Sequence, residues 1–291
     1  MNQEHSIEMS IKNQTFSTCF FALAITLVFI SACTEKKTKT LFTKVNEADS
    51  GLHFNNKLIL NDSVNILDNE FVYNGAGVAL GDLNGDGLED IFLTGNQVDN
   101  ALFLNKGNLK FQDISEIAQI GKPEKMIWSS GVTLLDVNND EKLDIYICNT
   151  FRATTPHRAN LLYINQGNNE KGQPTFKEMG NEYGISDTSY SSHAQFFDYD
   201  NDGDLDLFIA VNRIEGIDPT EFRPTDDDGT SKSRDILYQN QQNDRLGHPM
   251  FVNVSETAGI RYHGYSHSTL VHDFNDDGWM DIYVANDFLS N

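Results

Sequence analysis

The nine-residue stretch DLNGDGLED at residues 82–90 decides the fold, because three further copies of it follow along the chain. All four fit the pattern D-x-[ND]-x-D-[GE]-x-x-D and are called loops 1 to 4: 82–90, 136–144 (DVNNDEKLD), 198–206 (DYDNDGDLD) and 273–281 (DFNDDGWMD). Their first residues are 54, 62 and 75 positions apart (136 − 82, 198 − 136 and 273 − 198). Such regular recurrence is typical of an architecture that uses one supersecondary unit several times.

Short apolar segments stand on both sides of each loop. The segment after the loop is rich in β-branched and aromatic residues in every copy: 91–93 (IFL), 145–147 (IYI), 207–209 (LFI) and 282–284 (IYV). Such runs around a tight polar turn predict a β-hairpin. A second hairpin is expected from the stretch 102–105 (LFLN) with Phe111, and from its counterparts in the next two repeats. Two hairpins give four strands, so the sequence predicts an all-β fold in which each repeat is one blade of a β-propeller.

The loops have the composition and spacing of calcium sites. Hard cations such as Ca²⁺ take about six to eight oxygen ligands, and carboxylates at positions 1, 3 and 5 of a tight turn point inward together. Position 6 needs a backbone conformation that Gly tolerates best, position 7 offers its carbonyl, and the Asp of position 9 completes the site. The predicted ligands are Asp82, Asn84, Asp86, Leu88 and Asp90; Asp136, Asn138, Asp140, Lys142 and Asp144; Asp198, Asp200, Asp202, Asp204 and Asp206; and Asp273, Asn275, Asp277, Trp279 and Asp281. Loop 2 is the least certain of these four Ca²⁺ sites, because Glu141 replaces Gly at position 6.

The Asp pattern of the loops also has to be compared with an EF-hand and with a metal-free turn. An EF-hand begins with a similar Asp pattern, but it needs a carboxylate at position 12 and a helix on each side. Position 12 is apolar in every copy: Leu93, Ile147, Ile209 and Val284. The EF-hand is therefore rejected, and the alternative that stays open is a set of Asp-rich turns that close hairpins without metal.

The N-terminus has the features of a lipoprotein signal. An apolar run at 19–30 (CFFALAITLVFI) is too short to span a bilayer comfortably, and the lipobox-like sequence Ile-Ser-Ala-Cys ends at Cys33. We expect a signal peptide over residues 1–32, a lipid on Cys33, and a tether over 33–40. An ordinary cleaved signal or a short membrane anchor is the alternative.

The repeats are expected to fill residues 41–291, with both ends inside a blade. Phe42 and Gly51 match the late half of a repeat, and Asn291 comes directly after loop 4. We expect about four blades here, as an N-terminal part of a longer propeller.

Composition and motifs favour a binding protein over an enzyme. Acidic residues outnumber basic ones 43 to 21, and a net charge of −22 repels nucleic acid and anionic lipid. There is no G-x-S-x-G, H-E-x-x-H or phosphate-binding glycine loop. Cys148 stands alone in an apolar stretch and is expected in a buried strand. We therefore expect no catalysis, no nucleic-acid partner, and a protein or polysaccharide ligand. A larger glycan-active envelope enzyme, of which this chain is a non-catalytic part, is the competing hypothesis.

Aromatic residues near the loops are candidates for stacking on sugar rings: Trp128, Tyr190, Tyr262 and Tyr265. A role in the hydrophobic core is the more common one for such residues.

The repeat, with its flanking strands and its L-x-x-N sequence followed by Phe and Gly, resembles the FG-GAP or VCBS repeat of integrin-α-like β-propellers. It is similar in particular to large Bacteroidetes-type lipoproteins that carry this repeat ahead of an ASPIC/UnbV domain. The resemblance covers about residues 41–291. It implies a seven-bladed propeller, calcium in the loops, and adhesion, glycan handling or envelope assembly by a protein lipid-anchored in the bacterial cell envelope.

Overall fold

The computed structural model describes residues 40–67, 71–121, 127–151, 158–212, 228–243, 245–261 and 263–287. The chain divides into two compact units, Met1–Val45 and Asn46–Asn291. The apolar run at 19–30 and Cys33 lie outside the described residues. Within the described ranges, no helix combines the length and the apolar character that a membrane crossing requires.

Residues 40–45 of the first unit form no strand. Leu41 is 92% exposed and Phe42 is 86% exposed, so neither side chain packs against a core.

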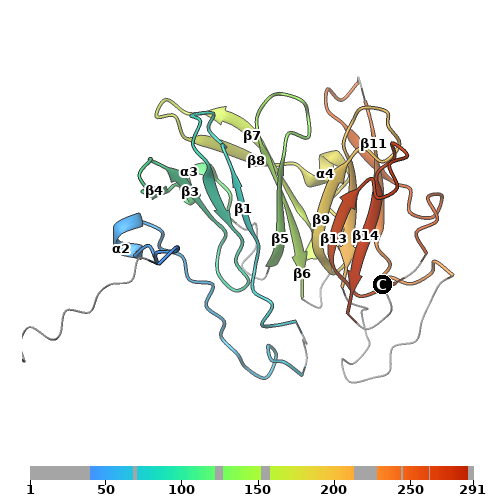
Figure 1. Cartoon of the computed structure of the whole chain (residues 1–291), viewed down its shortest axis with the longest axis horizontal. Helices are drawn as coiled ribbons and strands as arrows, with labels where there is room; N and C mark the ends of the chain where they lie inside the picture. The colour runs from blue at the N-terminus through green and yellow to red at the C-terminus, as the bar shows by residue number, and fades with distance from the viewer. Residues whose placement is uncertain are drawn as a thin grey trace, which may run out of the picture. The chain divides into compact units, whose positions relative to one another are not determined.

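The second unit is all-β, which confirms the predicted fold class. Three sheets have four antiparallel strands in chain order, and a fourth sheet has two (Figure 1). The first to third sheets are β1 (Val78–Gly81), β2 (Asp90–Leu93), β3 (Ala101–Asn105) and β4 (Phe111–Asp113); β5 (Trp128–Leu135), β6 (Asp144–Thr150), β7 (Leu161–Asn168) and β8 (Pro174–Glu178); β9 (Ser191–Phe197), β10 (Asp206–Val211), β11 (Ile236–Gln241) and β12 (Met250–Asn253). The fourth sheet pairs β13 (Ser266–His272) with β14 (Asp281–Asn286). The short helices are α2 (Glu47–Ser50), α3 (Ser115–Ala118) and α4 (Gly180–Tyr183).

Each Asp-rich loop joins the first two strands of its sheet. The Asp of position 9 opens the second strand and pairs with the residue just before position 1. The four pairs are Gly81 with Asp90, Leu135 with Asp144, Phe197 with Asp206 and His272 with Asp281. The hairpin predicted around each loop is therefore confirmed, and so is the second hairpin in the first three sheets.

Consecutive sheets stack face to face, as the blades of a propeller do. One buried cluster joins the first sheet to the second through residues such as Phe92 and Ile147. A second cluster joins the second sheet to the third, with Tyr146 against Phe196 at a ring-centroid distance of 5.4 Å. Phe208 of the third sheet packs toward β13 and β14. Figure 1 shows the first sheet toward the left of the view and β13 and β14 toward the right, where they overlap the third sheet.

The first strands of neighbouring sheets approach closely and are joined through side-chain hydroxyls. Ser130 Oγ donates to the Ser191 carbonyl oxygen at 2.8 Å, and Ser192 Oγ donates to the Ser266 carbonyl oxygen at 2.8 Å. A Cβ on Gly131 would lie 2.6 Å from the Ser192 carbonyl oxygen. Glycine is therefore required there for steric reasons.

The aromatic candidates are core residues wherever the structure describes them. Trp128 is 3% exposed, Tyr190 is 8% exposed and Tyr265 is 1% exposed. Tyr262 lies outside the described residues. These three rings present no open face on which a sugar could stack, so the core interpretation holds for them.

Candidate metal-binding loops

The carboxylate of position 1 organises each loop through backbone hydrogen bonds. In loop 3, Asp198 Oδ1 accepts from the Asp202 N–H at 3.1 Å and Asp198 Oδ2 accepts from the Gly203 N–H at 3.0 Å. The same two bonds recur in loops 1, 2 and 4. The position 5 carboxylate then accepts from the N–H of position 7, as Asp202 does from Asp204 at 3.1 Å. All four loops therefore share one turn geometry.

Two positions of every loop have a positive φ. At position 6 the residues are Gly87 (83°), Glu141 (64°), Gly203 (94°) and Gly278 (88°), so three loops place Gly at this φ and loop 2 places Glu there. At position 4 they are Gly85 (74°), Asn139 (58°), Asn201 (59°) and Asp276 (60°). The positive φ at position 4 was not predicted, although Gly, Asn and Asp are the residues that tolerate this region best.

The Asp of position 9 is fully buried in the first three sheets and links the loop to the third strand. In the third sheet, Asp206 Oδ2 accepts from the Tyr199 N–H at 3.0 Å, and Asp206 Oδ1 accepts from the Asn240 N–H at 2.8 Å. Asn105 and Asn165 bind Asp90 and Asp144 in the same way. These Asn residues were expected in the second hairpin of each repeat but were not among the predicted metal ligands.

Burial raises the pKa of these Asp residues, to about 6 for Asp90 and Asp206 and to about 7 for Asp144. The charges of neighbouring loop carboxylates add to the rise. An ionised carboxylate is costly in such a place unless a cation compensates it.

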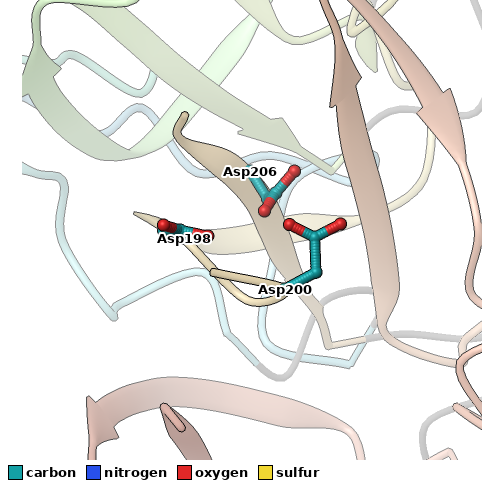
Figure 2. A group of neighbouring side chains, drawn as sticks. All are labelled: Asp198, Asp200 and Asp206. Carbon is teal, nitrogen blue, oxygen red and sulfur yellow. The ribbon is translucent and has the colours of Figure 1, made fainter. Parts of the chain in front are cut away.

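Loop 3 brings three carboxylates to one point. One oxygen each of Asp198, Asp200 and Asp206 lies within 4.8 Å of the others, and the three side chains lie at the turn that closes the β9–β10 hairpin (Figure 2). Asp200 Oδ1 is buried and has no hydrogen-bond partner. Asp202, the predicted ligand at position 5, is not in this group. An all-oxygen donor set with an unsatisfied buried oxygen fits a hard divalent cation.

Loops 1, 2 and 4 present fewer carboxylates, because position 3 is Asn84, Asn138 or Asn275. Their predicted ligands occupy the same turn geometry, with the amide of Asn84 donating to Asp86 Oδ2 at 3.0 Å. The amide oxygen at position 3 supplies a neutral ligand in place of a charged one.

Loop 2 contains a competing internal cation. Lys142 Nζ donates to Asp140 Oδ2 at 2.9 Å, and this bond raises the pKa of Lys142. Glu141 keeps the positive φ of position 6 without the freedom of Gly, which costs free energy. A metal in this loop would have to displace the ammonium group from Asp140.

Loop 4 is the most open of the four. Asp281 is partly exposed, and its Oδ2 accepts from the Phe274 N–H at 2.9 Å. Trp279 at position 7 is 52% exposed, and its N–H donates to Asp277 Oδ1 at 2.9 Å. Backbone hydrogen bonds, that from Gly278 foremost, lower the pKa of Asp273.

Position 7 of loop 3 differs from the others in carrying a buried side chain. Asp204 is 8% exposed, and its Oδ1 has no hydrogen-bond partner. Burial raises the pKa of Asp204 to about 6, and the charge of Asp202 adds to the effect. Its carboxylate therefore belongs to the acidic surroundings of loop 3, whereas only the backbone carbonyl of this position was expected to take part.

In the second and third sheets, a polar residue directly before the third strand hydrogen-bonds both to its own sheet and to the next one; this arrangement, called the inter-blade latch, was not predicted. Asn160 Oδ1 accepts from the Asn149 N–H at 2.8 Å, and Asn160 Nδ2 donates to Ser191 Oγ of the next sheet at 2.9 Å. Asp235 Oδ1 accepts from the Val211 N–H at 2.8 Å.

Asp235 also joins the third sheet to the fourth, because Ser266 Oγ donates to Asp235 Oδ2 at 2.8 Å. Burial raises the pKa of Asp235 to about 7. In the first sheet, Asn100 occupies the corresponding position, and its Oδ1 accepts from the Gly95 N–H at 3.1 Å. Asn100 Nδ2 and Ser129 Oγ of the second sheet are buried without a hydrogen-bond partner. The signal in the sequence was an Asn or Asp immediately before each third strand.

Part of the sequence matches a known protein family. Residues 60–147 match the FG-GAP-like repeat family. Cartilage acidic protein 1 of Mus musculus is 27% identical over 211 residues, which are 72% of this chain and 28% of that protein. The Homo sapiens protein of the same name is 26% identical over the same shares, and that of Xenopus tropicalis is 31% identical over 135 residues (46% of this chain, 19% of that protein).

The chain thus spans under a third of the length of these relatives. The matched residues take in the first sheet and most of the hairpin of β5 and β6. For residues 60–147 the match agrees with the FG-GAP resemblance stated from the sequence, and the structure builds this segment as the four-stranded first sheet followed by most of the β5–β6 hairpin.

Proposed function

We propose that this chain is a calcium-binding, membrane-tethered β-propeller scaffold that binds a protein or polysaccharide outside the cytoplasm, and that it is not an enzyme. The observation that carries the calcium assignment is the convergence of Asp198, Asp200 and Asp206 in loop 3. Charges of one sign this close repel each other, and a bound cation converts that repulsion into attraction.

The physical role of the ion is to hold the first hairpin of each blade. The position 9 Asp connects the loop to the third strand, so an ion that fixes Asp206 also fixes the backbone at Asn240. An ion at 100 times its dissociation constant stabilises the folded state by about 2.7 kcal/mol per site.

The support for membrane tethering and for a location outside the cytoplasm comes from the N-terminal sequence. The apolar run at 19–30 followed by Cys33 fits a lipoprotein signal, and a lipid on Cys33 would keep the domain at the bacterial cell envelope. No recognised catalytic motif occurs in this sequence.

Thermal unfolding of the chain, with calcium and with a chelator, tests the calcium assignment. We expect a calcium-dependent rise in Tm that is lost when position 1 is removed from three loops together, by Asp82→Ala, Asp198→Ala and Asp273→Ala. Asp62→Ala removes an exposed carboxylate outside the loops and serves as the control. A folded wild-type chain whose Tm ignores calcium would overturn the metal assignment and leave the loops as metal-free hairpin turns.

A further inference from the structure

A polar cavity lies at the strand ends opposite to the Asp-rich loops. Its volume is about 420 Å³, within the range of about 300–1,000 Å³ that is usual for small-molecule sites. Most of the lining comes from the segments that precede β7, β9 and β11, and Ile236 of β11 and Asn253 of β12 complete it, so the second and third sheets both contribute. Since β9 runs from Ser191 toward loop 3, this cavity and the candidate metal sites stand at opposite ends of the strands.

The cavity is basic although the chain is strongly acidic. Among the described residues that line it, Arg158, Lys232 and Arg234 stand beside one carboxylate, that of Asp187, which gives these lining residues a net charge of +2 (3 − 1) where the whole chain carries −22. Within the described ranges, neither Lys232 nor Arg234 forms an ion pair. A local positive field of this kind concentrates anions.

The one carboxylate is already engaged by its neighbours. Asp187 Oδ1 accepts from the Ser189 N–H at 2.7 Å, and Asp187 Oδ2 accepts from the Tyr238 hydroxyl at 2.9 Å. The Asp187 carboxylate is therefore hydrogen-bonded to residues beside the cavity, whereas Lys232 is exposed to solvent.

The guanidinium groups are held in place before any ligand arrives. Arg158 is 2% exposed, its Nε donates to the Thr188 carbonyl oxygen at 3.1 Å, and its guanidinium lies 4.2 Å from the centre of the Tyr190 ring. Arg234 Nη1 donates to the Gly229 carbonyl oxygen at 2.6 Å. Such fixed charges lower the entropic cost of binding.

The remaining lining residues are rich in hydroxyl and amide groups, which suit a polyhydroxylated ligand. They include Ser189, Thr230, Ser231 and Asn253. We infer that this cavity binds an acidic sugar unit of a polysaccharide, with its carboxylate or sulfate group at Lys232 and Arg234 and its ring hydroxyls on the Ser, Thr and Asn side chains. The inference rests on the proposed binding role and is independent of calcium in the loops.

Calorimetric titration of the full chain tests this site. The probes are trigalacturonate, a sulfated disaccharide, neutral maltotriose, inorganic sulfate and a short poly-glutamate peptide. We expect one of the two acidic sugars to bind, and a charge-assisted hydrogen bond of about 1.5–3 kcal/mol implies that Lys232→Gln and Arg234→Gln each weaken it by about 10- to 150-fold. Lys171→Gln removes an exposed charge from the turn between β7 and β8 and is the matched control.

Each other outcome overturns the inference. Equal binding of maltotriose, tighter binding of the peptide, or an affinity for inorganic sulfate as high as for the sugars would each show that no acidic-sugar site exists. The same conclusion follows if no probe binds, or if Lys171→Gln weakens binding as much as Lys232→Gln does. Melting curves of the variants in calcium show whether a loss of binding reflects the site or the fold, so a failure here is distinct from a failure of the calcium assignment.

Discussion

Replacing Asp235 by Asn should stabilise the protein in a pH-dependent way. Asp235 occupies the latch position that Asn160 fills one blade earlier, and both side chains hold a backbone N–H and the Ser hydroxyl of the next sheet. An Asn at 235 would keep both bonds, with its oxygen toward Val211 and its amide donating to Ser266 Oγ. The substitution therefore removes a buried charge without removing a hydrogen bond.

The magnitude follows from the raised pKa of Asp235. Its pKa rises from 3.8 to about 7 because burial disfavours the ionised form. Between these two pH values the unfolded chain releases the proton while the folded protein still holds it, so the folded state loses stability as the pH rises through this range. With about 1.36 kcal/mol per pKa unit, the penalty is about 4 kcal/mol at pH 8 and about 2 kcal/mol at pH 5, and it vanishes below the unfolded pKa. Asp235→Asn should raise the free energy of unfolding by these amounts.

Urea unfolding of wild type and Asp235→Asn at pH 8, 5 and 4 measures the difference, in constant calcium. The reverse change, Asn160→Asp, introduces a charge at the matched position and should destabilise the protein most at pH 8. A gain that is equal at pH 8 and pH 5, or a loss at pH 8, would refute the assignment of a buried, poorly compensated charge to Asp235.

Two further predictions concern packing. Gly131→Ala should destabilise the fold by about 1–3 kcal/mol, because the added Cβ meets the Ser192 carbonyl oxygen at 2.6 Å; Gly121→Ala, where nothing lies within 4 Å, should be near neutral in the same urea measurement. Cys148 is fully buried and burial raises its pKa, so it should not react with a thiol reagent in the folded protein and should react once the chain is unfolded; rapid labelling under native conditions would contradict this.

The hairpins could be predicted from the sequence because the loops anchor them. Each loop places Asp at fixed positions and a short apolar run directly after it, and the strands begin at those Asp residues, as β6 does at Asp144. The run after Asp144 is continuous rather than alternating because β6 is buried on both faces, with Ile145 toward the first sheet and Tyr146 toward the third. Such a strand carries little period-2 signal, so the adjacent loop supplied the information.

The inter-blade contacts could not be predicted, because they join residues far apart in the sequence. Nothing at Asn160 indicates that its amide meets Ser191 of the next sheet, since Asn before a strand is also a common turn residue. The basic cavity could not be predicted for the same reason. Arg158 and Lys232 stand 74 positions apart (232 − 158) in an acidic chain, and the stacking of two sheets brings them together.

The loops and the latches hold neighbouring blades at opposite ends, and this bears on how calcium would act. At the loop end, Asn165 Nδ2 donates to the Leu83 carbonyl oxygen of loop 1 at 3.0 Å, and Asn201 Nδ2 of loop 3 donates to the Gly278 carbonyl oxygen of loop 4 at 3.2 Å. An ion that orders one loop therefore also orders an acceptor or donor of its neighbour. Repeat proteins are stabilised largely through such nearest-neighbour terms, so calcium is expected to raise the cooperativity of unfolding across blades and not only the stability of single hairpins.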